Sequence, residues 1–420
     1  MRGSLLLLAI CLALPGAVRA QQYFDPGILQ KSIQQKPDEY QAVGARLGGF
    51  NFWPGAELSY ENNDNIFYDD QVKLSDDIWH FRPWFNLASD WSRHSLNFSG
   101  WADLARYNQN GDLDYDDWAT RMDGRIDVLH NSWFSWEGSY MHLHEDRRTP
   151  DSRQGLYPTE FDYYGGGLGY DHIFNRLKLG GYLRTNTYDY DNNVGLDGNL
   201  IDNQYRNRDE TTGTLRADYL ARPGRTYFVS YARTTVDYDL VLDLNGLARS
   251  SSGDTFNVGA KWDLTGVLTG DLFGAWSNRD YDDPTLPSVS GFHVGGDLNW
   301  SPSRLTLVNL RMAGGPQETV QLGTSGYYSR LYSARLQHEL RRNVLLNLRG
   351  SYTSNEYETV PAVNNALTDT KVYRAGLGLS YLMNRNVYLS AGYVYERQDS
   401  NQPTYEYRTN RYFLTLGLEL

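Results

Sequence analysis

Few residue clusters in this sequence have the side-chain types and spacing that a metal site needs. The acidic segment Asp112–Asp117 places alternate carboxylates as the first half of a calcium-binding loop does. Its sixth position is an aspartate, however, where such a loop needs glycine to turn sharply. The pair His142 and His144 could share one metal ion, although two histidines at this spacing are more typical of a strand end. We therefore predict no metal site and no cofactor, and interpret the acidic run as a solvated loop.

Motifs that carry catalysis in other proteins do not occur here. The sequence has no Gly-x-Ser-x-Gly, no His-Glu-x-x-His and no glycine-rich phosphate loop before a helix. The glycine triplet at 165–167 lies in an alternating segment, where glycine is typical of close packing or a bend. We predict no catalytic residues and no enzymatic activity.

Basic and aromatic side chains recur at one parity of alternating segments. Arginine binds carboxylates, including those of acidic sugars, through two parallel hydrogen bonds, and tryptophan or tyrosine rings can stack on sugar faces. This chemistry suits a polar track for a sugar polymer, although any water-filled pore has a polar lining. The residues that we predict along this path are Arg82, Trp84, Trp101, Lys178, Tyr182, Arg184, Arg216, Lys261, Arg311, Arg335, Arg349 and Arg374. Further charged residues at the same parity are Asp103, Arg121, Asp123, Arg125, Asp127, Glu137, Asp218, Asp263 and Asp297.

The elements that must position these side chains are β-strands, because apolar and polar residues alternate along the whole chain after residue 45. The alternation is clearest in the last segment, which places Tyr412, Leu414, Leu416, Leu418 and Leu420 on one face. This end resembles the C-terminal signal that the outer-membrane assembly machinery reads, with leucine at the last position where phenylalanine is commoner.

Short turns and long loops alternate between these segments. Eight tight turns rich in Gly, Pro, Asn, Ser and Arg occur near residues 93, 130, 175, 223, 265, 302, 342 and 385. Nine longer polar loops are predicted at 61–77, 108–117, 145–159, 188–209, 237–253, 280–288, 314–325, 356–369 and 398–407. Eight hairpins, one strand before them (about 46–60) and one after them (about 410–420) make 18 strands. We predict an all-β fold, a single transmembrane antiparallel barrel with short periplasmic turns and long extracellular loops.

Composition agrees with a barrel. The chain carries 33 Tyr, 11 Trp and 40 Gly with a net charge of -12. No stretch after Leu14 matches the ~18 apolar residues of a spanning helix. Tyrosine and tryptophan favour membrane interfaces, and alternation keeps the mean hydropathy of a barrel low.

The N-terminus has the pattern of a cleaved secretory signal. A short basic start is followed by the apolar run Ser4–Leu14 and by small residues before position 21. We predict a signal peptide at 1–20, a periplasmic lead-in at 21–44 and an outer-membrane barrel at 45–420. Cys11 fits a lipidation motif poorly. The lead-in, with a short helix near 28–35, is either a linker or a plug or handle for a periplasmic partner.

Several segments resemble the putative β-barrel porin 2 family. They are the opening Pro54–Tyr60, the following Asn62–Phe67, the pattern Phe81-Arg82-Pro83 and repeated Tyr-Asp pairs at the predicted outer tips. The resemblance covers nearly all of the mature chain and implies an outer-membrane pore of the EpsL type, which secretes exopolysaccharide or capsule. It implies no catalytic residues.

Three hypotheses for function follow. The leading one is a pore that exports polysaccharide through an aqueous lumen. The second is a general or oligosaccharide-selective porin for uptake, and the third is a surface enzyme or adhesin-like barrel that acts through its loops. The expected partners are outer-membrane lipid and lipopolysaccharide, the polysaccharide, periplasmic export proteins and the assembly machinery; we expect no binding of nucleic acid.

Overall fold

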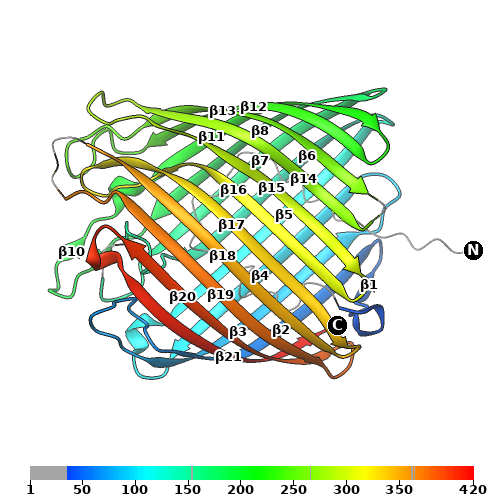
Figure 1. The fold of residues 1–420 in the computed structure, drawn as a ribbon, viewed down its shortest axis with the longest axis horizontal. Helices are drawn as coiled ribbons and strands as arrows, with labels where there is room; N and C mark the ends of the chain where they lie inside the picture. The colour runs from blue at the N-terminus through cyan, green and yellow to red at the C-terminus, as the bar shows by residue number, and fades with distance from the viewer. Residues whose placement is uncertain (1–35, 153–154, 265, 361–362, 364) are drawn as a thin grey trace, which may run out of the picture.

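The alternating segments form 18 antiparallel strands in the computed structural model, which describes residues 36–420 with gaps at 153–154, 265, 361–362 and 364 (Figure 1). The barrel strands are β2 (Phe50–Asn63), β3 (Asp76–Ser89), β4 (Ser95–Tyr107), β5 (Tyr115–Leu129), β6 (Ser132–His144), β7 (Glu160–Phe174), β8 (Leu177–Tyr190), β11 (Arg208–Arg222), β12 (Arg225–Tyr238), β13 (Ser251–Leu264), β14 (Leu268–Tyr281), β15 (Val289–Ser303), β16 (Thr306–Glu318), β17 (Thr324–Arg341), β18 (Val344–Thr359), β19 (Asp369–Leu382), β20 (Val387–Ser400) and β21 (Tyr407–Glu419). The last strand closes the barrel by pairing with β2, from Gly55↔Glu419 to Asn63↔Arg411. The predicted fold class and closure are confirmed.

Only short elements lie outside the barrel strands of the described chain. They are β1 (Ala45–Leu47), the pair β9 (Asn193–Val194) and β10 (Leu200–Ile201), and the 3₁₀ turns η1 (Asp38–Tyr40), η2 (Gly111–Leu113), η3 (Gln204–Arg206) and η4 (Pro403–Tyr405). No helix among these residues is long and apolar enough to cross a membrane.

The eight predicted tight turns all join neighbouring strands, but two predicted boundaries are wrong. The first barrel strand runs over Phe50–Asn63 instead of 46–60. The chain reverses at Gly48, with φ of +61°, so residues 45–47 form the separate strand β1, which pairs with the start of β2. The predicted loop 314–325 is largely strand, because β16 continues to Glu318 and β17 begins at Thr324. The predicted signal peptide and the helix near 28–35 lie outside the described residues.

Alternation gives the barrel two different faces. Leu414, Leu416 and Leu418 of β21 are exposed on the outer face, whereas Glu57, Ser59 and other polar residues of β2 are buried on the inner face. Aromatic rings pair across strands on the outer face, as in Tyr60–Trp79, Trp118–Tyr140, Tyr352–Tyr373 and Tyr393–Tyr412. An apolar outer face with paired aromatic rings is typical of a wall in contact with lipid.

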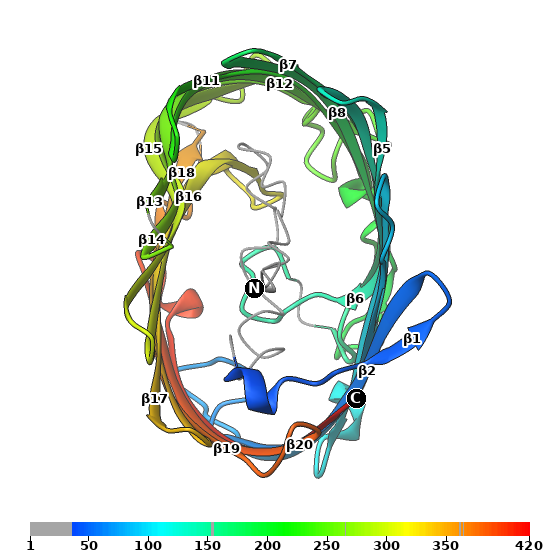
Figure 2. The same cartoon turned by 90° about the vertical axis from the view of Figure 1, so that its right-hand side faces the viewer.

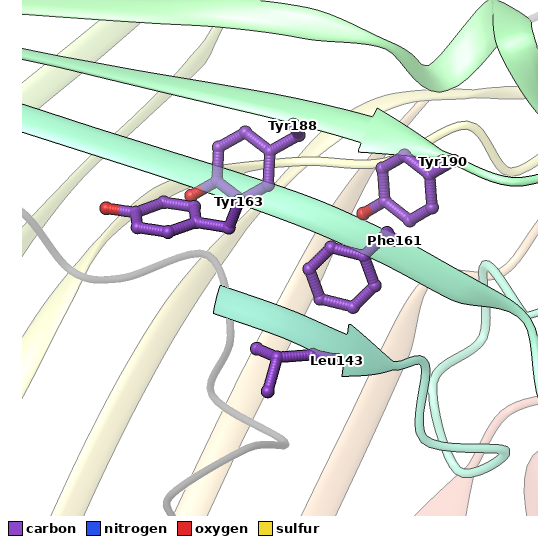
Figure 3. Packing of buried hydrophobic residues seen from close by; sticks show 5 residues of the cluster. All are labelled: Leu143, Phe161, Tyr163, Tyr188 and Tyr190. Carbon is purple, nitrogen blue, oxygen red and sulfur yellow. The ribbon is translucent and has the colours of Figure 1, made fainter. Parts of the chain in front are cut away.

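The largest apolar cluster of the described residues lies inside the barrel. Leu143 of β6, Phe161 and Tyr163 of β7, and Tyr188 and Tyr190 of β8 pack together near the long-loop end of the wall (Figure 3). Trp101 of β4 packs against the same cluster. The cluster lies beside the end of β6, from which the next long loop starts.

Candidate pore and its outer constriction

Aromatic and charged residues line the inner face of β3 and β4. Arg82 Nε lies 3.0 Å from a carboxylate oxygen of Asp103, and both side chains are largely buried. Trp84 and Trp101 are direct cross-strand partners. The indole of Trp84 lies against Gly55, where an added Cβ would be 2.4 Å from the ring. Glycine on β2 therefore allows this ring to lie flat against the wall.

Cations and acids alternate along the inner wall of β5 to β11. Lys178 Nζ is 3.1 Å from Asp171 and 3.5 Å from Asp218, and the hydroxyl of Tyr182 donates to Asp171. Further ion pairs join Arg184 and Arg121 to Glu137, Arg125 to Asp127, and Arg216 to Asp218. Neighbouring charges therefore neutralise one another on this side of the barrel, as the mixed composition of the predicted lining allows.

The next part of the wall, from β13 to β16, also carries both basic and acidic residues. Lys261, Asp271, Asp297 and Arg311 are successive cross-strand partners on β13 to β16, and Lys261 and Arg311 are exposed to the lumen. Asp263 lies two residues after Lys261 in β13, on the same face.

Two further arginines follow on the next strands, where Arg335 lies directly opposite Arg349. Arg374 Nε lies 2.7 Å from Glu396. The structure thus places all twelve predicted path residues on the inner face, and their contact with a substrate remains a prediction.

The loop after β6, described at residues 145–152 and 155–159, turns into the barrel (Figure 2). We call it the inward loop. Arg148 in this loop reaches β20, six strands around the barrel from β6, where its guanidinium contacts Glu396. Glu396 is fully buried and also faces Arg374, Arg411 and the hydroxyl of Tyr407. Three guanidinium groups around one carboxylate thus fix the tip of the inward loop to the wall.

Two further ion pairs lie near the start of the inward loop. Asp146 pairs with Arg148 within the loop, and Glu145 pairs with Arg206 of η3 in a neighbouring loop. Burial by itself raises the pKa of Asp146, but the Arg148 guanidinium outweighs it and holds the pKa of that carboxyl below its ordinary 3.8. The anchor is therefore charged at neutral pH.

The outer ends of β16 and β17 reach into the lumen from another part of the wall and meet the inward loop. Thr319 Oγ1 donates to Asp151 at 2.6 Å, and Gln321 donates to the carbonyl of Pro150. The hydroxyl of Tyr405 in a third loop donates to Gln321 at 3.0 Å. These contacts join three outer segments into one constriction.

The periplasmic end has its own inward segment. Lys36 pairs with Glu419 of the closing strand and lies over the ring of Tyr388. Tyr40 packs against a buried cluster formed by Leu345, Leu382 and Tyr388. Residues 36–40 of the lead-in thus contact the inner wall, and the choice between linker, plug and handle stays a prediction.

The outer constriction was not predicted from the sequence, which assigned 145–159 to an external loop. A signal exists in hindsight: Glu145 to Arg148 are four consecutive charged residues, and Glu396 is an acid at an inner-facing position of β20. The two segments are far apart in the chain, however, and local patterning does not pair them. Neither His142 nor His144 belongs to a metal cluster among the described residues; they pair with Asp162 and Asp117.

Comparison with known proteins agrees with this architecture. The model of a family described as putative beta-barrel porin 2 matches residues 36–420, so the chain belongs to that family. No functionally curated protein matches the chain in sequence.

The chain is also similar to solved structures of low sequence identity. OccAB3 of Acinetobacter baumannii is 13% identical, with a TM-score of 0.46, over 89% of this chain and 100% of that one. OccK2 (OpdF) of Pseudomonas aeruginosa is 11% identical, with a TM-score of 0.46, over 89% and 98%. The siderophore receptor PirA of A. baumannii is 7% identical, with a TM-score of 0.41, over 87% and 80%. With its family and its 18-stranded barrel, the chain is an outer-membrane β-barrel porin.

Proposed function

We propose that this member of the putative beta-barrel porin 2 family exports an acidic exopolysaccharide through its lumen. The observation that carries the proposal is the set of basic residues on the inner face of β13 to β18, here called the basic lining, which outnumbers the acids Asp263, Asp271 and Asp297 of that face. Lys261 and Arg311 are exposed to the lumen there, and Arg335 and Arg349 are direct neighbours. A chain that bears carboxylates would bind such a lining by charge-assisted hydrogen bonds.

Aromatic residues on the other side of the lumen support a saccharide over another polyanion. Trp84, Trp101 and Tyr182 all belong to the inner face, and each is only partly buried. Rings with one accessible face can stack on the apolar face of a sugar, whereas inorganic anions gain nothing from them. The family resemblance noted in the sequence implies the same cargo.

Deletion of the gene in its host tests the direction and the cargo together. Export predicts that extracellular polysaccharide disappears and that the polymer accumulates in the periplasm. The double variant Lys261→Glu/Arg311→Glu should restore export poorly, because a negative lining repels an acidic chain. Arg304→Glu is the matched control, since Arg304 is exposed in the short turn before β16, at the end of the lumen wall. Normal polysaccharide in the deletion strain would contradict export.

A porin for uptake of acidic oligosaccharides is the second candidate. The outer constriction favours it, because the inward loop meets the β16–β17 segment inside the barrel and leaves less room for a polymer than for a short solute. In the same deletion strain, slower growth on acidic oligosaccharides with unchanged secreted polysaccharide would support this function.

A further inference from the structure

The ladder between β15 and β16 stops halfway along the barrel wall. Its pairs run from Ser303↔Thr306 at the short-turn end to Gly296↔Met312 near the middle. In contrast, the next pair of strands stays in register over the whole length of β16, up to Glu318↔Gly326. Residues 289–318 all belong to the described chain. The outer half of the β15–β16 seam therefore has no main-chain ladder.

Beyond Gly296 the two strands overlap instead of lying edge to edge. A Cβ added to Gly314 would lie 2.7 Å from the Cβ of His293, which is on the inner face of β15. Farther along, Glu318 reaches Arg279 of β14, and Gly326 lies against the hydroxyl of Tyr281. The outer half of β16 thus lies inside β14 and β15, and Figure 2 shows this yellow hairpin reaching into the lumen.

The local sequence explains why β16 can leave the wall. Gly314 and Gly315 are followed by Pro316, and Gly315 has a φ of +142°, which side chains other than glycine rarely adopt. Proline has no N–H to donate to a neighbouring strand, so Pro316 weakens any ladder that reaches it. The absence of a side chain at Gly314 also allows close contact with His293 on the inner face of β15.

Side chains close the seam where the ladder is missing. Arg330 Nε donates to the carbonyl of Phe292 at 3.2 Å, and Tyr328 and His293 share a hydrogen bond of 2.9 Å. Ser325 Oγ donates to the carbonyl of Pro287 at 2.7 Å. In a wall that faces lipid, main-chain groups without partners are costly, so this edge of β15 is held less firmly than a paired strand.

We propose that the outer half of the β16–β17 hairpin, residues 313–330, is a gate of the pore. In the structure the gate is folded inward and contacts the inward loop inside the barrel. It opens by moving back into the wall, where β16 extends its present register with β15. The new pairs would begin at Gly295↔Ala313 and Val294↔Gly314 and continue toward Ser290↔Glu318. The proposal concerns ion flow and does not depend on the nature of the cargo.

The two positions of the gate exchange one set of polar contacts for another. The inward position is held by Glu318, which pairs with Arg279 and accepts a hydrogen bond from Tyr238. It is also held by Arg249, whose Nη1 donates to the carbonyls of Thr319, Thr324 and Ser325. The wall position would replace these contacts with ladder hydrogen bonds to β15. Opening would also expose Arg279 and Arg249 to the lumen.

Cysteine pairs can hold the gate in each position, because the chain's single cysteine, Cys11, lies in the predicted signal peptide. His293→Cys with Gly314→Cys should cross-link the inward position, since a small shift brings their Cβ atoms to the roughly 3.8 Å of a disulfide. Val294→Cys with Gly314→Cys should cross-link only the wall position. Leu298→Cys with Leu310→Cys is the matched control, because these residues are already paired.

The readout is single-channel conductance of the full barrel in planar bilayers, before and after reduction, with cross-linking checked by mass spectrometry. We expect the oxidised 293/314 pair to remain in a low-conductance state and to recover on reduction. We expect the oxidised 294/314 pair to remain open with several-fold higher conductance, and the 298/310 pair to show no change. Glu318→Gln, without any cysteine, should lengthen the open intervals.

Two results would overturn the gate. One is equal conductance of the 293/314 pair in its oxidised and reduced forms. The other is a 294/314 pair that does not cross-link under conditions in which the 298/310 pair does. Since none of these measurements involves a saccharide, failure of the gate is distinguishable from failure of the proposed export function.

Discussion

Arg148 in the inward loop and Glu396 on β20 form an ion pair inside the barrel, with Arg148 Nη1 at 2.9 and 2.8 Å from the two carboxylate oxygens. The two residues are 248 positions apart in the chain. The pair fixes the inward loop to the inner wall of the barrel. It also means that the position of the inward loop depends on a few contacts with the wall at β20.

Removal of the arginine should widen the pore. In Arg148→Ala, Glu396 keeps Arg374 and Arg411, so the wall stays folded while the inward loop loses its anchor. We expect higher single-channel conductance and larger current fluctuations. Arg408→Ala is the control, because it removes an exposed pair with Asp70 in another outer loop. Unchanged conductance in Arg148→Ala would show that the loop does not limit the pore.

Removal of the carboxylate should destabilise the barrel itself. Glu396→Gln removes the carboxylate that three guanidinium groups share, and among the described residues only Arg148, with Asp146, and Arg411, with Glu61, keep another. Breaking a buried pair in this way typically costs about 3–5 kcal/mol. The loss should appear in urea unfolding of the detergent-solubilised protein, followed by tryptophan fluorescence. Glu406→Gln, which lies in the adjacent outer loop, should leave the unfolding midpoint nearly unchanged.

The inward loop should tolerate mild acid. Burial alone raises the pKa of Asp146, but Arg148 holds the pKa of this carboxyl below its ordinary 3.8. A lowered folded-state pKa means that the stabilisation is complete above the ordinary value and is lost as the pH falls through the lowered one. Conductance should therefore stay constant from pH 7 to about 4 and rise below that. A rise that begins near pH 6 would point to a different anchor.

Charge reversal on the basic lining should change ion selectivity. Lys261→Glu and Arg311→Glu replace positive charges that are exposed to the lumen with negative ones. The reversal potential in a potassium chloride gradient should shift toward cation preference in each variant and further in the double variant. Arg304→Glu in the short turn should shift it much less. An identical shift in all variants would place these residues outside the conducting path.

Deletion of 414–420 should abolish insertion into the outer membrane. These residues supply the partners of Gly55 to Tyr60 on β2, so their loss leaves two strand edges facing lipid. The truncated chain should be absent from the outer-membrane fraction and should lose heat-dependent mobility in gels. Leu420→Phe, which matches the commoner terminal residue, should insert at least as well as the natural chain. A truncated barrel that still inserts would contradict closure by β21.

Much of this fold follows from the sequence because its rules are local. Period-two alternation assigns each side chain to one face, so Arg82 on β3 and Arg374 on β19 could be placed on the inner face without knowledge of their partners. Tight turns with favourable residues fix the number of strands, and the free apolar end Tyr412–Leu420 requires a partner in the first strand. Each of these conclusions depends on a few consecutive residues.

The constriction and the gate were decided by tertiary structure alone. The sequence near Arg148 does not name Glu396 as its partner, and Gly314-Gly315-Pro316 has the composition of an ordinary loop, which is why 314–325 was predicted as one. Whether β16 pairs with β15 or folds over its inner face depends on the balance between ladder hydrogen bonds and distant ion pairs such as Glu318–Arg279. That balance involves residues from several strands at once, and no local pattern contains it.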